Sequence, residues 1–231
     1  MIVFGKNVAR DLLLNNNKKV EKIILQDGFS DNEILSLIEK RNINVIIKQK
    51  REIDRLISGV HQGILLYIPD YQYSSIETAY NDDVVVILDH LEDPHNLGAI
   101  IRTCEVAGIK NIILPKDRIV SVNETVMKTS AGALNHVNLI LVTNLTETIK
   151  KLKKDGFWFV GMDMDGENYK QIDYKGKIGL IVGSEGFGMS NLVTKQCDFI
   201  ASIPMKGKVN SLNASVAAGI IIFEAMSQRW D

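Results

Sequence analysis

Along the first 70 residues, some segments have the apolar periodicity of strands and others that of helices. One helix is predicted after Ser30, because Ser30 and Glu33 have capping-box spacing and apolar residues then recur at helical intervals. The pattern thus predicts a small α/β domain at residues 1–70. The segments expected to be strands are 20–25, 45–47 and 63–68, and the other expected helices are 7–14 and 52–57.

A polar, turn-rich segment that contains Pro69 follows, and we expect a linker at residues 71–81. The run VVVIL at residues 84–88 is continuously apolar, as in a strand buried on both faces. Strands then alternate with helices to the end of the chain, which predicts a parallel sheet in a second domain at residues 82–231. The other expected strands are 111–114, 139–142, 157–160, 178–182 and 199–203, and the clearest expected helices are 97–107 and 211–228.

Composition narrows the class of protein only slightly. The net charge of −1 does not indicate a nucleic-acid partner. Residues 1–70 nevertheless carry 11 Lys and Arg against 9 Asp and Glu, in clusters that fit either a solvated face or phosphate contacts. The two cysteines, Cys104 and Cys197, form no CxxC pattern, so we expect no disulfide framework or zinc site, and a cytoplasmic protein. No apolar run approaches the roughly 20 residues of a membrane span.

The first candidate for chemistry is LDHLEDPHNLGAIIRTCEVAG, which follows the strand at residues 84–88. Its acidic and histidine residues match no familiar metal-binding spacing. Asn96 is most simply a helix cap. Arg102 lies among apolar residues of the predicted helix and would need an anionic partner if buried. Two interpretations are equally good: an ion pair with Asp89, Asp93 or Glu105, or a clamp on a phosphate of a ligand.

Two more candidate segments each follow a predicted strand. GLIVGSEGFGMS has glycine spacing that differs from the dinucleotide fingerprint and from the P-loop, and its Glu185 faces either a helix N-terminus or a ligand. SIPMKGKVNSLNASVAAG places Ser211 and Asn213 at the start of the last helix, where capping is the simplest role. Because the carboxyl ends of parallel strands meet at one edge of a sheet, we expect the three segments to converge there.

Taken in order, PHNLGAIIRT, LIVGSEGFGMS and IPMKGKVNSLNASVAAG resemble the three motifs of the SpoU (TrmH-type) RNA ribose 2′-O-methyltransferases. Residues 1–70, with GVHQGILLYIPDY, resemble the small L30e/L7Ae-like RNA-binding domain of one subgroup, which includes the bacterial 23S rRNA guanosine 2′-O-methyltransferases. The resemblance implies an α/β, SPOUT-type catalytic domain with a deep trefoil knot. It also implies a homodimer.

The same resemblance implies that S-adenosyl-L-methionine donates a methyl group to a ribose, in 23S rRNA by the subgroup match, with no metal. Because a guanidinium stays protonated, Arg102 is expected to clamp a phosphate rather than act as a base. The alternatives are a tRNA ribose methyltransferase or a non-catalytic RNA-binding assembly factor; an oxidoreductase would need the dinucleotide fingerprint, which is missing. The implied catalytic residues are Asn96, Arg102, Glu185, Ser211 and Asn213, and the implied cofactor-binding residues are Gly183, Ile203, Leu212, Ser130, Gly132 and Met205.

Overall fold

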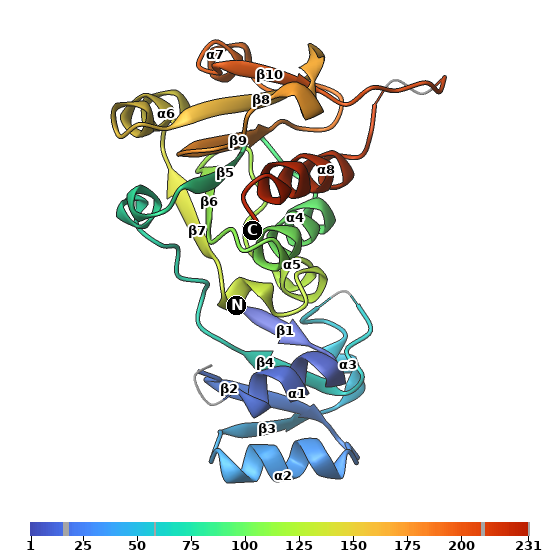
Figure 1. The fold of residues 1–231 in the computed structure, drawn as a ribbon. Coiled ribbons are helices and arrows are strands. Elements are labelled where there is room, and N and C mark those ends of the chain that lie inside the picture. Colours follow the sequence, from blue (N-terminus) through green and yellow to red (C-terminus); the bar gives the residue numbers. More distant parts are fainter. Residues whose placement is uncertain (16–18, 58, 209–210, 231) are drawn as a thin grey trace. The chain divides into compact units, whose positions relative to one another are not determined.

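A computed structural model describes residues 1–15, 19–57, 59–208 and 211–230 of the chain (Figure 1). The chain divides into two compact units, Met1–Gln72 and Tyr73–Asp231, each with its own sheet. In the part of the chain that the structure describes, no helix is both long and apolar enough to cross a membrane.

The first unit has a four-stranded mixed sheet in the order β1-β4-β2-β3. Strands β2 and β3 are parallel, and β4 is antiparallel to both β1 and β2. The sequence pattern did not predict β1, because three residues are too few for a periodic signal. The elements of this unit are β1 (Ile2–Phe4), α1 (Lys6–Leu14), β2 (Lys22–Gln26), α2 (Asn32–Lys40), β3 (Val45–Lys48), α3 (Lys50–Ile53) and β4 (Ile64–Tyr67).

Helix α2 begins one residue later than the predicted capping box implies. Asp31 is its N-cap, and the Asp31 carboxylate accepts a hydrogen bond from the Ile34 backbone N–H at 3.3 Å. Arg10 of α1 forms an ion pair with the same carboxylate at 2.9 Å. The Ile34 hydrogen bond is the main cause that lowers the pKa of Asp31. The cap therefore also joins α1 to α2.

The second unit has a six-stranded sheet in the order β10-β8-β9-β5-β6-β7, and every pairing in it is parallel, as predicted. Strands β5 and β9 have the predicted bounds. The elements of this unit are η1 (Ile76–Asn81), β5 (Val84–Leu88), α4 (Pro94–Val106), β6 (Asn111–Pro115), α5 (Glu124–Thr129), η2 (Ala133–Asn135), β7 (Asn138–Val142), α6 (Leu145–Lys154), β8 (Trp158–Asn168), η3 (Tyr169–Gln171), β9 (Ile178–Val182), α7 (Asn191–Thr194), β10 (Phe199–Ser202) and α8 (Ala214–Ser227).

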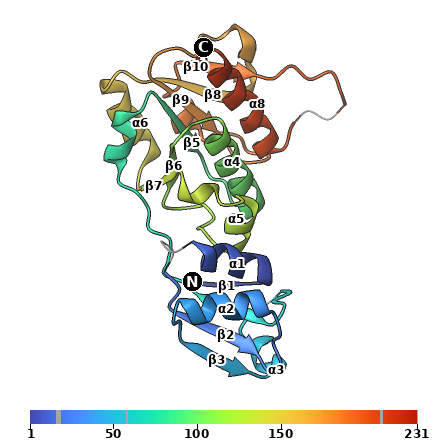
Figure 2. The same cartoon turned by 60° about the horizontal axis from the view of Figure 1, so that its bottom comes forward.

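Helices cover both faces of this sheet. On one face, α6, α7 and η1 bury apolar side chains against alternate residues of the strands, in a core that includes Val85, Ile87 and Phe159. Helices α4 and α8 pack side by side and lie with α5 on the other face (Figures 1 and 2). The last helix of the chain is thereby held beside the helix that follows β5.

The predicted linker at residues 71–81 is too long. The structure assigns Tyr73 onward to the second unit, and the Ser74 backbone N–H donates to the Leu139 carbonyl oxygen at 2.8 Å. Ala79 of η1 is fully buried, and Ile76 and Tyr80 pack against the same core. These three apolar residues recur at helical spacing, and their burial against the sheet outweighs the polar character of the segment.

Candidate active site

The last helix starts later than predicted, and its start holds one of the expected site residues. Helix α8 begins at Ala214, and Asn213 is its N-cap. The side-chain oxygen of Asn213 accepts hydrogen bonds from the backbone N–H groups of Ser215, at 3.0 Å, and Val216, at 3.3 Å. Capping is therefore confirmed for Asn213, whereas Ser211 precedes the helix. Residues 209 and 210 of the same motif lie outside the described residues.

The amide nitrogen of Asn213 links all three candidate segments. It donates to the side-chain oxygen of Asn96 at 2.9 Å and also to the Glu185 carboxylate. The Asn96 amide donates to Glu185 Oε1 at 2.9 Å, and the Ala214 backbone N–H donates to that oxygen at 3.2 Å. The negative charge of Glu185 thus lies at the N-terminus of α8, where the helix dipole is favourable. The predicted convergence of the segments places these residues in one hydrogen-bonded cluster.

Asn96 does not cap helix α4, contrary to the simplest prediction. The N-cap is Asp93, whose carboxylate accepts from the His95 backbone N–H at 2.9 Å, and Pro94 follows at the first helical position. Asn96 lies within the first turn and is buried. A buried amide needs hydrogen-bond partners, and Asn96 finds them in Glu185 and Asn213.

The loop that carries Glu185 is a tight, fixed turn. The backbone N–H of Ser184 donates to the Gly188 carbonyl oxygen at 3.0 Å, and the Gly188 N–H donates back to the Ser184 carbonyl oxygen at 3.0 Å. Gly186 and Gly188 have φ angles of +83° and +65°, which favour glycine. At Gly183, a Cβ atom would lie 2.1 Å from the Gly188 carbonyl carbon. The glycines therefore allow the backbone to fold closely on itself beneath Glu185.

A buried carboxylate ties this loop to the end of β5. Asp89 is fully buried, and its Oδ2 accepts from the Ser190 backbone N–H at 2.7 Å. Its other oxygen lies 2.5 Å from Nδ1 of His90, whose φ angle is +60°. The end of β5 is thus joined to the start of α7, just after the Glu185 loop, by a side-chain hydrogen bond.

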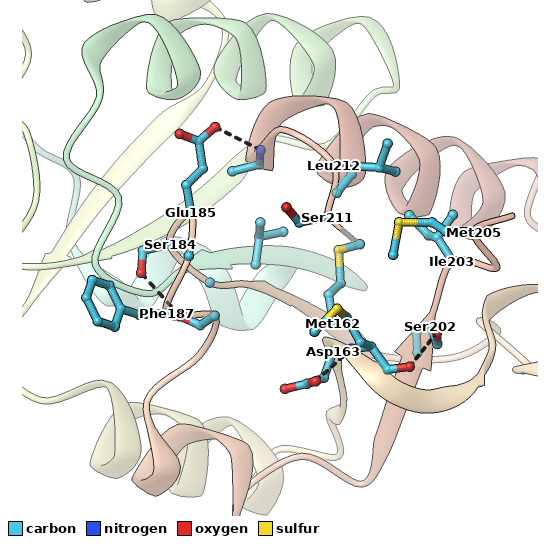
Figure 3. A pocket seen from close by; sticks show the side chains of 18 residues that line it. Met162, Asp163, Ser184, Glu185, Phe187, Ser202, Ile203, Met205, Ser211 and Leu212 are labelled. Atoms are coloured by element: carbon cyan, nitrogen blue, oxygen red, sulfur yellow. Dashed lines mark hydrogen bonds between the residues drawn. The ribbon is translucent and has the colours of Figure 1, made fainter. Parts of the chain in front are cut away.

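A pocket of about 250 Å³ opens on one side of the Glu185 loop (Figure 3). Its wall is largely apolar, with the hydroxyls of Ser184, Ser202 and Ser211 and the carboxylate of Asp163 among the polar groups. Of the predicted residues, Gly183, Glu185, Ile203, Met205, Ser211 and Leu212 line it. We call it the donor pocket, after the predicted cofactor-binding residues that line it.

A second cavity of about 660 Å³ borders the same loop. Asn96 and Glu185 line it, and the loop from Ser184 to Gly188 borders both hollows. We call this the acceptor cavity. Its other lining residues are His90, Leu91, Glu92, Asp93, Arg118, Met189 and Ser190.

Four predicted site residues line neither hollow. Asn213 is one of them, although it hydrogen-bonds to Asn96 and Glu185, which do. The other three are Arg102, Ser130 and Gly132. Arg102 is exposed rather than surrounded by apolar side chains, and it forms no ion pair with any described residue. Of the two interpretations left open for Arg102, the internal ion pair is therefore not found. Ser130 is fully buried, and its hydroxyl donates to the Met127 carbonyl oxygen at 3.0 Å. Gly132 is the N-cap of η2. Neither Ser130 nor Gly132 lines the donor pocket.

The sequence interpretation missed part of the donor-pocket wall. Met162, Asp163 and Met164 belong to β8, which continues eight residues past the predicted end at residue 160. The signal was present, because polar residues follow an apolar strand here as they do after β5 and β9. In the described ranges, no group of three or more His, Cys, Asp or Glu side chains is placed to hold a metal ion.

The sequence pattern of the SpoU rRNA methylase family matches residues 83–223. The chain belongs to the SpoU methylase family. A second pattern, that of the RNA 2′-O ribose methyltransferase substrate-binding domain, matches residues 2–74. Together these matches show that the chain is an RNA methyltransferase of the SpoU/TrmH type.

Relatives and solved structures agree with this family. A TrmH family tRNA/rRNA methyltransferase of Staphylococcus saprophyticus is 39% identical over 99% of this chain and 96% of its own length. The SpoU methyltransferase AviRb from Streptomyces viridochromogenes, solved with AdoMet, has a TM-score of 0.83 at 21% identity and covers 99% of this chain and 90% of its own. A TrmH/SpoU tRNA-modifying enzyme of A. aeolicus has a TM-score of 0.60 at 29% identity and covers 67% of this chain and 82% of its own.

Proposed function

We propose that this SpoU-family methyltransferase transfers the methyl group of S-adenosyl-L-methionine to the 2′-oxygen of a ribose, with a guanosine of 23S rRNA as the acceptor. The observation that carries the proposal is the Asn96–Glu185–Asn213 cluster, in which Glu185 lines both hollows. A transfer reaction needs one site for each reactant and a shared boundary where they meet. The cluster supplies that boundary.

The donor pocket fits S-adenosyl-L-methionine by its chemistry. Its apolar wall suits the adenosine ring and the methionine chain, and its serine hydroxyls suit the ribose and the charged groups of the ligand. AviRb and a rRNA methyltransferase of Sinorhizobium meliloti were both solved with AdoMet. The sulfonium is already an activated methyl donor and leaves as the neutral thioether S-adenosyl-L-homocysteine. The site must therefore hold the donor against the acceptor oxygen, and a nearby group, such as the RNA phosphate, must take the proton that the 2′-hydroxyl loses.

Glu185 is placed to orient that acceptor. Its Oε1 accepts from Asn96 and Ala214, while its Oε2 receives no hydrogen bond from any described residue. A ribose hydroxyl in the acceptor cavity could therefore donate to Oε2 and direct its lone pair toward the donor pocket. Positioning of this kind supplies much of the acceleration in a reaction between two bound reactants.

Arg102 can contribute to the proposed site only if a second copy of the chain brings it there. It lies on the exposed side of α4 with Val106, outside the hollows of its own chain. On the neighbouring helix α8, Val216 and Phe223 are exposed at a seven-residue spacing, and Trp230 continues the series beyond the helix end. We therefore propose a homodimer that covers this apolar face and brings Arg102 of one copy to a phosphate outside the acidic wall of the other copy's acceptor cavity.

RNA is the substrate class of the family, and one observation favours rRNA over tRNA. The S. meliloti structure, an rRNA methyltransferase by its title, matches 100% of this chain, whereas the tRNA-modifying enzyme matches 67%. The first unit carries exposed basic residues at Lys50, Arg51 and Arg55, which suit RNA of either kind. These would contact phosphates, so binding should weaken with salt. The trefoil knot and the cytoplasmic location remain parts of this proposal.

The direct test is incubation of the protein with labelled S-adenosyl-L-methionine and total RNA from a strain that lacks its gene. We expect label on one ribose of 23S rRNA, found by mapping the methylated position. Label on tRNA would replace the rRNA assignment, and binding of RNA without label would favour an assembly factor. Deletion of residues 1–70 should abolish RNA methylation and leave cofactor binding intact.

The dimer is tested by co-expressing Arg102→Ala and Glu185→Ala, each expected to be inactive alone. If Arg102 acts across the dimer, the mixture should recover about a quarter of the wild-type rate, because half of the dimers are mixed and each has one intact site. If Arg102 serves its own chain, the mixed dimers contain no intact site, and the mixture stays inactive.

A further inference from the structure

Phe187 is the most exposed large apolar residue of the chain that the structure describes, at 93%. A single exposed apolar side chain needs no explanation by itself. Phe187, however, lies in the loop shared by the donor pocket and the acceptor cavity, two residues after Glu185. Figure 3 shows its ring turned away from Ser211, Leu212 and Ile203 of the donor pocket.

The ring is carried by a rigid support. The two backbone hydrogen bonds between Ser184 and Gly188 close the turn on either side of it, and Asp89 fixes the backbone at Ser190, just after the turn. The backbone that carries the ring is thus already ordered before a ligand arrives. Only the two side-chain torsions of Phe187 need to be fixed on binding, which limits the entropy cost.

The acceptor cavity around Phe187 has an acidic wall. It contains the carboxylates of Glu92, Asp93 and Glu185, against the single cation Arg118 among its described lining residues. Carboxylates repel a phosphate but accept hydrogen bonds from N–H groups. An uncharged group with N–H donors at its edge therefore suits this wall better than a phosphate does.

We infer that Phe187 stacks on an unpaired nucleobase of the substrate RNA at the mouth of the acceptor cavity. The π face of the ring meets the π face of the base, as RNA-binding proteins hold splayed-out bases. The N–H edge of the base is turned toward the carboxylates. This inference rests on the proposed function, since it assigns the binding mode of the RNA that is methylated.

The test measures kcat and KM for methylation by variants of the full-length protein. The substrate is an RNA fragment that contains the methylated site. Phe187→Ala should raise KM for the RNA about tenfold, with kcat little changed, because one base–aromatic stack is lost. Phe187→Leu keeps an apolar side chain without the ring and should resemble Phe187→Ala. Leu192→Ala is the matched control, because Leu192 of α7 is 66% exposed and lines neither hollow.

Phe187→Trp adds a spectroscopic signal. It should retain a KM near that of the wild type, and its additional fluorescence should be quenched when unlabelled RNA binds, as expected of a stacked indole. Wild-type methylation in the same assay reports on the proposed function. If the wild type methylates the RNA and the Phe187 variants behave like it, this inference fails while the proposed function stands.

Three results would overturn the assignment. Equal KM values for Phe187→Leu and the wild type would show that no aromatic stack forms. A weaker calorimetric affinity for S-adenosyl-L-methionine in Phe187→Ala, with an unchanged KM for RNA, would place the ring against the donor instead. Dissociation of a dimer in Phe187→Ala, seen by sedimentation, would place it at a subunit contact.

Discussion

Replacing Asn213 with alanine removes two kinds of hydrogen bond at once. The side-chain oxygen caps α8 through Ser215 and Val216, and the side-chain nitrogen holds Asn96 and Glu185. Alanine keeps neither. The variant therefore measures how strongly the start of the last helix is coupled to the other two motifs.

The magnitude follows from the geometry. Loss of an N-cap costs about 1 kcal/mol. The side-chain oxygen of Asn96, which is buried, would also lose its donor, and an unsatisfied buried acceptor costs about 1–3 kcal/mol. The total of about 2–4 kcal/mol should lower the Tm of this unit by about 5–12 °C.

Asn144→Ala is the matched control. Asn144 is the N-cap of α6, accepts from the Glu147 backbone N–H at 3.1 Å, and is exposed. Its loss should cost the cap alone, about 1 kcal/mol. Thermal unfolding followed by circular dichroism compares the two variants. Equal shifts in Tm would refute the reasoning, because they would show that the contacts of Asn213 with Asn96 and Glu185 add no stability.

Three further outcomes are expected. Gly183→Ala should weaken calorimetric binding of S-adenosyl-L-methionine at least tenfold, because its Cβ would lie 2.1 Å from the carbonyl carbon of Gly188 and displace the loop; unchanged affinity would contradict this. Burial raises the pKa of Glu124 from 4.5 to about 7. Ionised Glu124 therefore lowers the free energy of unfolding above pH 7, and this loss of stability disappears as the pH falls toward 4.5. Glu124→Gln should therefore raise Tm more at pH 8 than at pH 5, and an equal effect at both would argue against it. Burial raises the pKa of Cys197 to about 12 and also raises that of Cys104, so neither thiol should be alkylated by iodoacetamide at pH 8 in the folded protein, as mass spectrometry would show.

Much of the second unit could be predicted from local patterns. Continuous apolar runs mark strands buried on both faces, and β5 and β9 match the predicted bounds. Parallel strands share a carboxyl edge, which predicted that the segments of Asn96, Glu185 and Asn213 converge. The glycines of the second segment serve a close backbone turn, as the space at Gly183 shows.

Other features depended on what packs against each element. The sequence placed Arg102 on a helix among apolar residues, but only the packing of α4 against α8 decided that its side chain is exposed. The polar character of the segment Ile76–Asn81 predicted a linker. In the structure it is a 3-10 helix, because Ala79 is buried against the sheet.

The sequence by itself determined the family motifs, the parallel sheet and the edge where the site lies. The tertiary structure decided that Asn96 is a buried hydrogen-bonding residue rather than a cap, that Ser130 lies away from the donor pocket, and that Phe187 borders both hollows. The physical reason is that the spacing of apolar residues fixes which side chains share a face of a helix or strand. Which faces become buried, and which border a cavity, depends on neighbours that are distant in the sequence.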